Sequence, residues 1–297
     1  MQRLEHSFVT LDVFTDHTFG GNPLAIFPNA GHLDATTMQA IAGELNLSET
    51  VFIIRPDENA SPRLRIFTPR VELPFAGHPT VGAAIFLAEE AGAADRAPRV
   101  LETAAGAVLI DLRQDAEGRL EAFVTSPQPP RKGPAPSPQA AAAALRIAAR
   151  DLAFAPAAFS AGVPYAFVPV ASRELLSQAS LDPARWEESF KGAWAPAIFV
   201  FTMDDWESGR EVHGRMFAPG IGITEDPATG SAAAALAGLL VDLQGIADGQ
   251  CGWSVRQGED MGRPSTIHIK ATVSNGVVES AQIGGSAVRL IEGKIRC

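Results

Sequence analysis

The chain has 297 residues, 46% of them hydrophobic and 20% charged, which is typical of a globular protein of about two domains. Its net charge of −10 gives it no electrostatic attraction to nucleic acid or to an anionic membrane. The cysteines Cys251 and Cys297 form no disulfide framework, and the first residues are too polar for a signal peptide or a membrane span. We therefore expect a cytoplasmic protein.

The first part of the chain predicts strands that alternate with two helices. The first helix, residues 34–47, is expected to be capped by Asp34 and to turn its apolar residues to one face. The second, residues 78–92, is apolar and has Pro79 at its first position. The β-branched and alternating segments predict strands at 7–14, 23–27, 50–54 and 63–68, followed by a hairpin of 106–112 with 119–124.

A proline-rich segment divides the chain. Six of the residues in 127–138 are prolines, which continue neither a helix nor a sheet. We interpret it as the link between two lobes, 1–129 and 130–287, and expect the tail 288–297 to join the first lobe.

The two halves resemble each other. Segment 65–88 is similar to 215–238, and 21–28 is similar to 162–169. In this alignment His78-Pro79 lies opposite Asp226-Pro227. The second half repeats the pattern with a buried helix at 227–243 and strands near 252–257, 266–273 and 277–283. The expected fold is α+β: two lobes related by a pseudo-twofold axis, each a curled, mostly antiparallel sheet around a central helix.

A titratable residue stands at the start of each apolar helix. Asp226 either only caps its helix or also takes part in chemistry, and His78 is a poor cap. Helix starts bind anions through their amides, and the small Gly230 and Ser231 leave room for a carboxylate. If both helix starts face one cleft, it suits proton transfer beside a bound carboxylate. Glu225 is interpreted as a solvated loop acid.

Five motifs together resemble the phenazine-biosynthesis PhzF-like isomerases, which share the fold of diaminopimelate epimerase. The motifs are "FTDHTFGGNPLAIF", "NLSETVFI", "FAGHPTVGAA", "ITEDPATGSAAAAL" and "QGEDMGRPS", spread from about residue 8 to about residue 290. In thiol-based epimerases of this fold, each lobe contributes a catalytic cysteine. Here Ala76-Gly77 and Asp226-Pro227 stand at those places, so a two-thiol racemase is not expected.

The resemblance implies roles for particular residues. Glu49, in "NLSET", corresponds to the catalytic glutamate, which acts as general base and then as acid. His78 and Asp226 match other catalytic positions. The substrate-binding residues would be Asn22, Gly77, Gly230 and Ser231. The implied substrate is a small carboxylate, with no metal or organic cofactor, and dimerisation is common among relatives.

Other interpretations remain open at this point. Glu49 alone would usually be a solvated residue, His78 a structural histidine, Asn22 a turn former and Ser231 a small helix residue. The function could also be amino-acid epimerisation or racemisation, metal-dependent hydrolysis, or binding of a small molecule without catalysis. The substrate itself cannot be read from the sequence.

Overall fold

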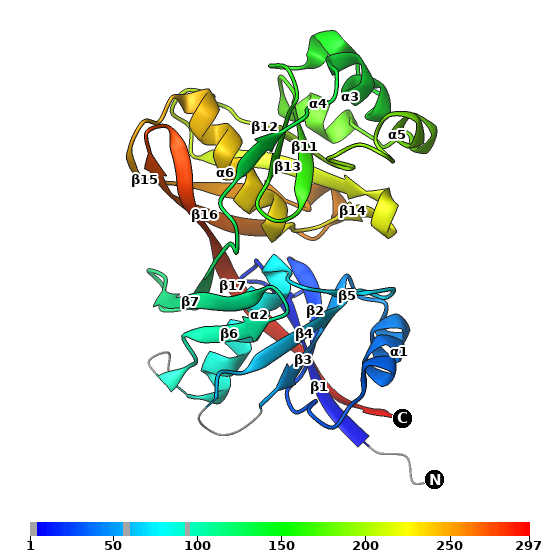
Figure 1. Cartoon of the computed structure of the whole chain (residues 1–297), viewed down its shortest axis with the longest axis vertical. Coiled ribbons are helices and arrows are strands. Elements are labelled where there is room, and N and C mark those ends of the chain that lie inside the picture. Colours follow the sequence, from blue (N-terminus) through cyan, green and yellow to red (C-terminus); the bar gives the residue numbers. More distant parts are fainter. Residues whose placement is uncertain (1–4, 56–59, 93–95) are drawn as a thin grey trace. The chain divides into compact units, whose positions relative to one another are not determined.

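A computed structural model describes residues 5–55, 60–92 and 96–297 (Figure 1). The chain forms two compact units, Met1–Thr125 with Gly284–Cys297, and Ser126–Ile283. The last strand, β17 (Val277–Arg296), begins in the second unit and ends in the first, where it pairs with β1 (Glu5–Val13). None of the helices in the described ranges is long and apolar enough to cross a membrane.

The first unit is a mostly antiparallel sheet. Pairs β1–β2, β3–β4, β4–β5, β6–β7 and β7–β8 are antiparallel, whereas β2–β3 and β4–β6 are parallel. The strands after β1 are β2 (Asn22–Phe27), β3 (Glu49–Ile54), β4 (Arg63–Phe67), β5 (Glu72–Leu73), β6 (Val100–Thr103), β7 (Gly106–Gln114) and β8 (Leu120–Thr125). The hairpin expected from the sequence is therefore confirmed as β7 and β8.

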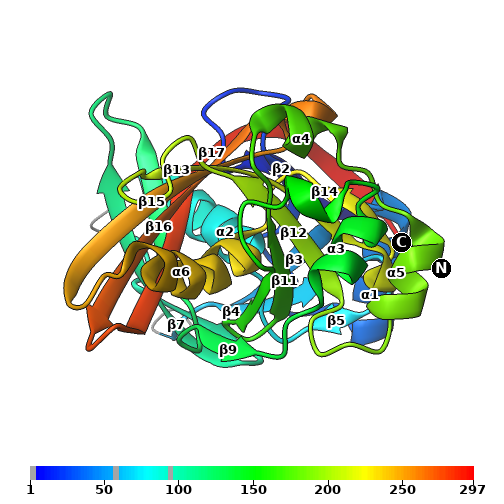
Figure 2. The same ribbon diagram turned by 90° about the horizontal axis from the view of Figure 1, so that it is seen from above.

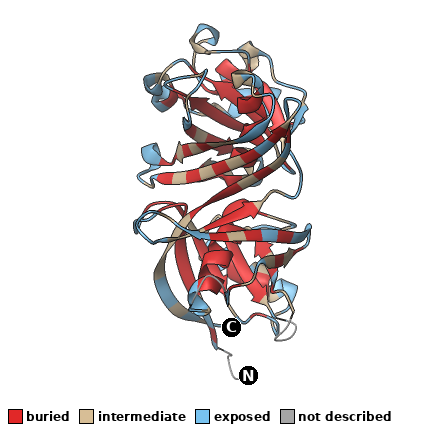
Figure 3. Cartoon of the chain, turned by 90° about the vertical axis from the view of Figure 1, so that its left-hand side faces the viewer, coloured by how far each residue is buried: buried red, intermediate tan, exposed pale blue. Residues whose placement is uncertain are grey.

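Helix α2 (Gly77–Glu90) is the core of the first unit. It is buried from Gly77 to Ala88, and it packs against β1, β2, β3 and β8 (Figure 3). Gly82 permits a close approach, because a Cβ there would lie 2.6 Å from Leu24 Cδ2 and 2.8 Å from Val13 Cγ2. Helix α1 (Ala35–Leu45) packs on a separate aromatic cluster, and Asp34 caps it by accepting from Thr37 N, as the sequence predicts.

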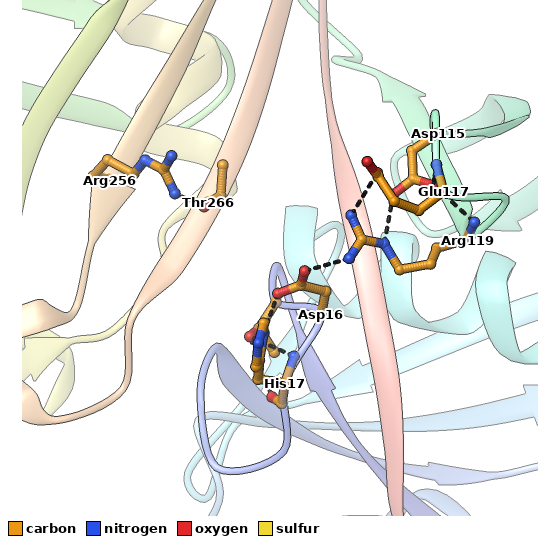
Figure 4. A network of polar contacts seen from close by, with 8 residues as sticks. Asp16, His17, Asp115, Glu117, Arg119, Arg256 and Thr266 are labelled. Atoms are coloured by element: carbon orange, nitrogen blue, oxygen red, sulfur yellow. Dashed lines mark hydrogen bonds and ion pairs between the residues drawn. The ribbon is translucent and has the colours of Figure 1, made fainter.

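Ion pairs of one arginine connect the loop after β1 with the β7–β8 hairpin. Arg119 donates to Asp115 and to Asp16, each at 2.6 Å, and to Glu117 at 3.0 Å (Figure 4). In the second unit, the Arg256 side chain donates to Thr266 Oγ1 at 2.7 Å across a strand pair. These exposed contacts orient surface segments and contribute little to stability one by one.

The second unit repeats the strand arrangement. Pairs β10–β11, β12–β13, β13–β14 and β15–β16 are antiparallel, and β11–β12 and β13–β15 are parallel, just as at the matching places of the first unit. The strands are β9 (Arg131–Gly133), β10 (Ala157–Ser160), β11 (Pro164–Pro169), β12 (Ala197–Thr202), β13 (Glu211–Ala218), β14 (Ile223–Asp226), β15 (Gly249–Gln257) and β16 (Ser265–Ser274).

Helices cover both faces of the second sheet. The buried helix α6 (Gly230–Gln244) packs against β9, β10, β11 and β16. On the other face lie α3 (Pro138–Ala144), α4 (Arg173–Gln178) and α5 (Pro183–Ser189), whose Ala141, Leu176 and Trp186 share a cluster with apolar strand residues (Figure 2). The 3-10 turns Ala149–Asp151, Pro219–Ile221 and Glu259–Met261 complete the unit.

The proline-rich segment is more structured than expected. Residues Arg131–Gly133 form β9, which pairs with β10, and Pro138 is the first residue of α3, after its cap Ser137. The unit boundary falls at Thr125/Ser126, so the segment belongs to the second unit. The prolines are compatible with this structure. They flank the short strand β9 without lying in it, and Pro138 is at a helix start, where no backbone N–H is needed.

Candidate active site

The first unit brings Glu49 and His78 together. Glu49 begins β3, and His78 is the second residue of α2. The two side chains are 13% and 5% exposed, and His78 Nε2 lies 3.4 Å from Glu49 Oε2. Glu49 was expected between a helix and a strand; the strand includes it, so its backbone is held by the sheet. The sequence alone gave no reason to expect its burial.

Burial keeps His78 neutral. It lowers the pKa of the imidazole from 6.5 to about 3, because the charged form would lose its hydration. A neutral imidazole carries one N–H donor and one acceptor nitrogen. His78 can therefore donate to a Glu49 carboxylate through Nε2–H, or accept from a protonated Glu49 at the same nitrogen. The 3.4 Å separation is longer than a normal hydrogen bond and leaves room for tightening when a ligand binds.

Two other predicted residues lie in this unit. Gly77 is the first residue of α2, and its neighbour Ala76 is the N-cap, without a side-chain cap bond. The expectation that the helix starts at His78-Pro79 is therefore wrong by a residue. Asn22 is fully buried at the start of β2, two residues before Leu24, which pairs with Glu49. This burial argues against the interpretation that Asn22 only forms an exposed turn.

In the second unit, Asp226 is part of a buried polar cluster. It is the last residue of β14, and its Oδ2 accepts a hydrogen bond of 2.5 Å from Thr229 Oγ1. Gln257 Oε1 accepts from Thr229 N at 3.1 Å, and Gln257 Nε2 donates to Asp226 O at 2.7 Å. The N-cap of α6 is Thr229, so the prediction that Asp226 caps this helix with Pro227 as its first residue is wrong.

Ser231 also has a partner that the sequence analysis missed. Its Oγ lies 2.7 Å from the hydroxyl of Tyr165, the single tyrosine of the chain, which is buried on β11. Gly230 directly precedes Ser231 and begins α6. Tyr165 and Gln257 lie far from "DPATGS" in the sequence. Strand pairing brings Gln257 near this segment, and the packing of α6 on β11 brings Tyr165 near Ser231. Gln257 is the first residue of the motif "QGEDMGRPS".

Glu225 is not a solvated loop acid. It is on β14, its side chain is 17% exposed, and it accepts two bonds from Arg215, at 2.8 and 2.9 Å. Successive residues of a strand point to opposite faces, so Glu225 and Asp226 face different surroundings.

The helix starts correct the alignment of the two halves. Gly77 and Gly230 are the first residues of α2 and α6, and a proline stands three residues before each. His78 therefore corresponds to Ser231, and Asp226 corresponds to Leu73. Strand register agrees, because Ile66 pairs with Leu73 and Met216 with Asp226. The expected match of His78 with Asp226 is wrong by five residues.

The corrected alignment also bears on thiol chemistry. The residues directly before the two helices are Ala76 and Thr229, neither of which is a cysteine. Cys251 is on β15, where burial raises the pKa of its thiol, and Cys297 is exposed at the chain end. Within the described ranges, no group of three or more His, Cys, Asp and Glu side chains is arranged to hold a metal ion.

Comparison with known proteins shows the family to which this fold belongs. The family model described as phenazine biosynthesis-like protein matches residues 11–293. An uncharacterized isomerase of Mesorhizobium japonicum is 42% identical, over 97% of this chain and 98% of its own. The trans-2,3-dihydro-3-hydroxyanthranilate isomerase of Pseudomonas aeruginosa is 34% identical, over 97% and 99%. The crystal structure of a Bacillus anthracis phenazine biosynthesis protein of the PhzF family has the same fold, with a TM-score of 0.86 at 24% identity over 98% and 99%.

These matches define the class of the protein as an isomerase. The chain belongs to the phenazine biosynthesis-like (PhzC-PhzF) family, as the sequence motifs indicate.

Proposed function

We propose that the protein isomerises a small carboxylate without a cofactor, by moving a proton between two carbons. The observation that carries this proposal is the pairing of Glu49, at the start of β3, with a buried, neutral His78 at the start of α2, 3.4 Å apart. The activity named for the Pseudomonas aeruginosa relative, isomerisation of trans-2,3-dihydro-3-hydroxyanthranilate, supports the same class of reaction.

Glu49 is the group that moves the proton. As a carboxylate it takes a proton from a carbon of the conjugated acid, and the electron pair of that C–H bond shifts into the double-bond system. The protonated Glu49 then returns the proton to a second carbon, and the double bond moves. Neutral His78 suits both states of Glu49, because its Nε2 can donate to the carboxylate or accept from the carboxylic acid.

The starts of α2 and α6 supply donors for negative charge. The first amides of a helix have no partner within that helix, and the helix dipole favours an anion there. Gly77 and Gly230 keep these places free of a side chain, and Ser231 adds a hydroxyl. We assign to these groups the binding of the substrate carboxylate and of the enolate-like charge that develops during proton transfer. Local donors of this kind are needed because the net charge of −10 repels an anion.

Asp226 is the second acid–base group in this proposal. It is 6% exposed and bonded through Thr229 and Gln257 to the start of α6. Its role is to exchange a proton with a polar group of the substrate while Glu49 acts on carbon.

The test is proton transfer in deuterated water. The purified protein is incubated in D2O with trans-2,3-dihydro-3-hydroxyanthranilate and with simpler cyclic dienyl acids, and NMR follows both double-bond position and deuterium at carbon. Glu49→Gln is expected to reduce the rate by about 10²–10⁴-fold, whereas Glu49→Asp, which keeps a carboxylate, retains part of it. Unchanged exchange in Glu49→Gln would exclude Glu49 as the proton carrier. Inversion at one carbon without double-bond movement would instead select epimerisation.

A further inference from the structure

We infer that Thr229 and Gln257 fix Asp226 Oδ2 as a hydrogen-bond acceptor, so that Oδ1 is the oxygen of this carboxyl group that takes up and releases a proton. The inference deepens the proposed function and rests on it for the substrate group with which that proton is exchanged. It assigns a positioning role to two residues, one at the N-cap of α6 and one at the end of β15.

The orientation of the Gln257 amide is set by the backbone. The Thr229 N–H can only donate, so the oxygen of the Gln257 side chain must be the atom that faces it, at 3.1 Å. The nitrogen of the same amide then faces the other way. It donates to Asp226 O at 2.7 Å and to Thr229 Oγ1 at 3.0 Å.

The orientation of the Thr229 hydroxyl follows from the amide. Oγ1 receives a hydrogen from Gln257 Nε2, so its own hydrogen is directed to its second partner, Asp226 Oδ2, at 2.5 Å. If Asp226 donated from Oδ2 instead, the Thr229 hydrogen would be buried with no acceptor that the described residues provide, because Thr229 is 6% exposed. Such a buried donor is costly, and an Oδ2 that carries no proton avoids it.

The fold holds this chain of bonds rigidly. Gln257 is 1% exposed and comes from β15, which runs parallel to β13, while β13 pairs with β14. Gly258 follows with φ +78, and a Cβ there would lie 2.7 Å from Pro227 O. A side chain at position 258 would push the Gln257 segment away from Asp226, so the close approach depends on glycine.

Two other carboxylates near this part of the sheet lie beside Arg215. On β14 itself Glu225 pairs with Arg215 of β13, and Asp260 of the 3-10 turn lies 3.4 Å from Arg215 Nε. Glu225 points to the opposite face of β14 from Asp226. Thr229→Val therefore removes the hydroxyl that donates to Asp226 Oδ2 and leaves the Arg215–Glu225 ion pair in place.

The experiment is a direct titration of Asp226 in the full-length protein. The protein is labelled with ¹³C at aspartate side-chain carboxyls, and the Asp226 signal is assigned by its loss in Asp226→Asn. In Thr229→Val the midpoint of this signal is expected to move upward by about one pH unit, a tenfold change in proton affinity. Thr229→Ser, which keeps the hydroxyl, should restore it.

Further variants make the result decisive. Gln257→Met should raise the midpoint less, because the Thr229 hydroxyl remains. If Thr229→Val does not fold, Thr229→Ala makes the same comparison. An unchanged midpoint in a folded Thr229 variant without the hydroxyl overturns the inference.

The titration needs no substrate, so it separates this inference from the proposed function. If isomerisation is observed, the acidic limb of the kcat/KM profile should shift in the same direction as the NMR midpoint. A shifted midpoint in a protein that shows no isomerisation would count against the function alone.

Discussion

Arg215 forms a two-bond ion pair with Glu225, the residue directly before Asp226. The Arg215 Nε and Nη2 atoms lie 2.8 and 2.9 Å from the Glu225 oxygens, and Nη1 donates to the carbonyls of Leu176, Ser177 and Ala179. One side chain therefore joins β13 and β14 to the end of α4. The first unit has the same two-bond ion pair between Arg65 and Glu72, in which Nε and Nη2 lie 2.7 and 2.6 Å from the carboxylate oxygens. In both units the guanidinium also covers a phenylalanine two residues on, Phe67 at 5.1 Å and Phe217 at 5.2 Å.

The two arginines give a matched pair of stability predictions. Arg215→Met should lower the free energy of unfolding by about 3–5 kcal/mol, because it leaves the mostly buried Glu225 and three carbonyls without their donor. Arg65→Met should cost about 1 kcal/mol, since the Glu72 side chain is 37% exposed and water can replace the arginine. Urea unfolding of both variants measures the difference. Equal losses would contradict the argument from burial.

The burial of His78 predicts a pH dependence of stability. Its pKa is about 3 in the folded protein, against 6.5 for a histidine in water, so between these values the unfolded chain binds more protons. Stability due to this residue is therefore complete above pH 6.5 and decreases as the pH falls toward 3. Between pH 7.5 and pH 5 the loss should be about 2 kcal/mol.

Urea unfolding at these two pH values tests the effect of His78. In His78→Asn the free energy of unfolding should change less between pH 7.5 and pH 5 than in the original protein, by about the same 2 kcal/mol, because asparagine does not titrate. His17→Gln is the control, since the His17 side chain is 80% exposed. If His78→Asn keeps the full pH dependence, another group is responsible for it.

Gly82→Ala tests how tightly α2 packs against the sheet. The added Cβ would lie 2.6 Å from Leu24 Cδ2, so side chains or backbone must shift, at about 1–3 kcal/mol. In Gly31→Ala the nearest atom is Ile54 Cγ2 at 3.7 Å, and the change should be within about 0.5 kcal/mol. Thermal or urea unfolding compares the two. A neutral Gly82→Ala would mean that α2 moves aside at no cost.

A double mutant tests the prediction that Glu49 and Asp226 serve one substrate. Glu49→Gln and Asp226→Asn should each lower kcat/KM for the isomerisation, by up to about 10²–10⁴-fold. If both groups act in the same proton transfer, the double variant should lose less than the product of the single losses, because residues that act as a unit are not additive. Strictly multiplicative losses would favour independent roles.

Much of the site could be predicted from the sequence because the motifs are local. "NLSET" and "FAGH" begin 29 residues apart, and the resemblance to known isomerases identified Glu49 and His78. Strand and helix patterns gave β1 to β4, the β7–β8 hairpin and α1 with its Asp34 cap, because hydrophobic periodicity and capping depend on neighbouring residues.

The exact helix starts could not be predicted. Pro79 and Pro227 both looked like first helical residues, but α2 begins before the one and α6 well after the other. The connection between the Arg-containing strand and the helix is three residues longer in the second unit, and short similar motifs do not show where such an insertion falls. The wrong match of His78 with Asp226 followed from this.

The sequence by itself thus determined the family, the repeated α+β pattern and the residue types available for acid–base chemistry. The tertiary structure decided which of them are buried and which are bonded to each other. Gln257 bonds Asp226 because β15 and β14 both pair with β13, and Tyr165 bonds Ser231 because helix α6 packs against β11. Local patterns specify elements, whereas hydrogen-bond direction and burial depend on how those elements pack. Burial set by this packing keeps His78 neutral, and packing also decides which partners Asp226 has.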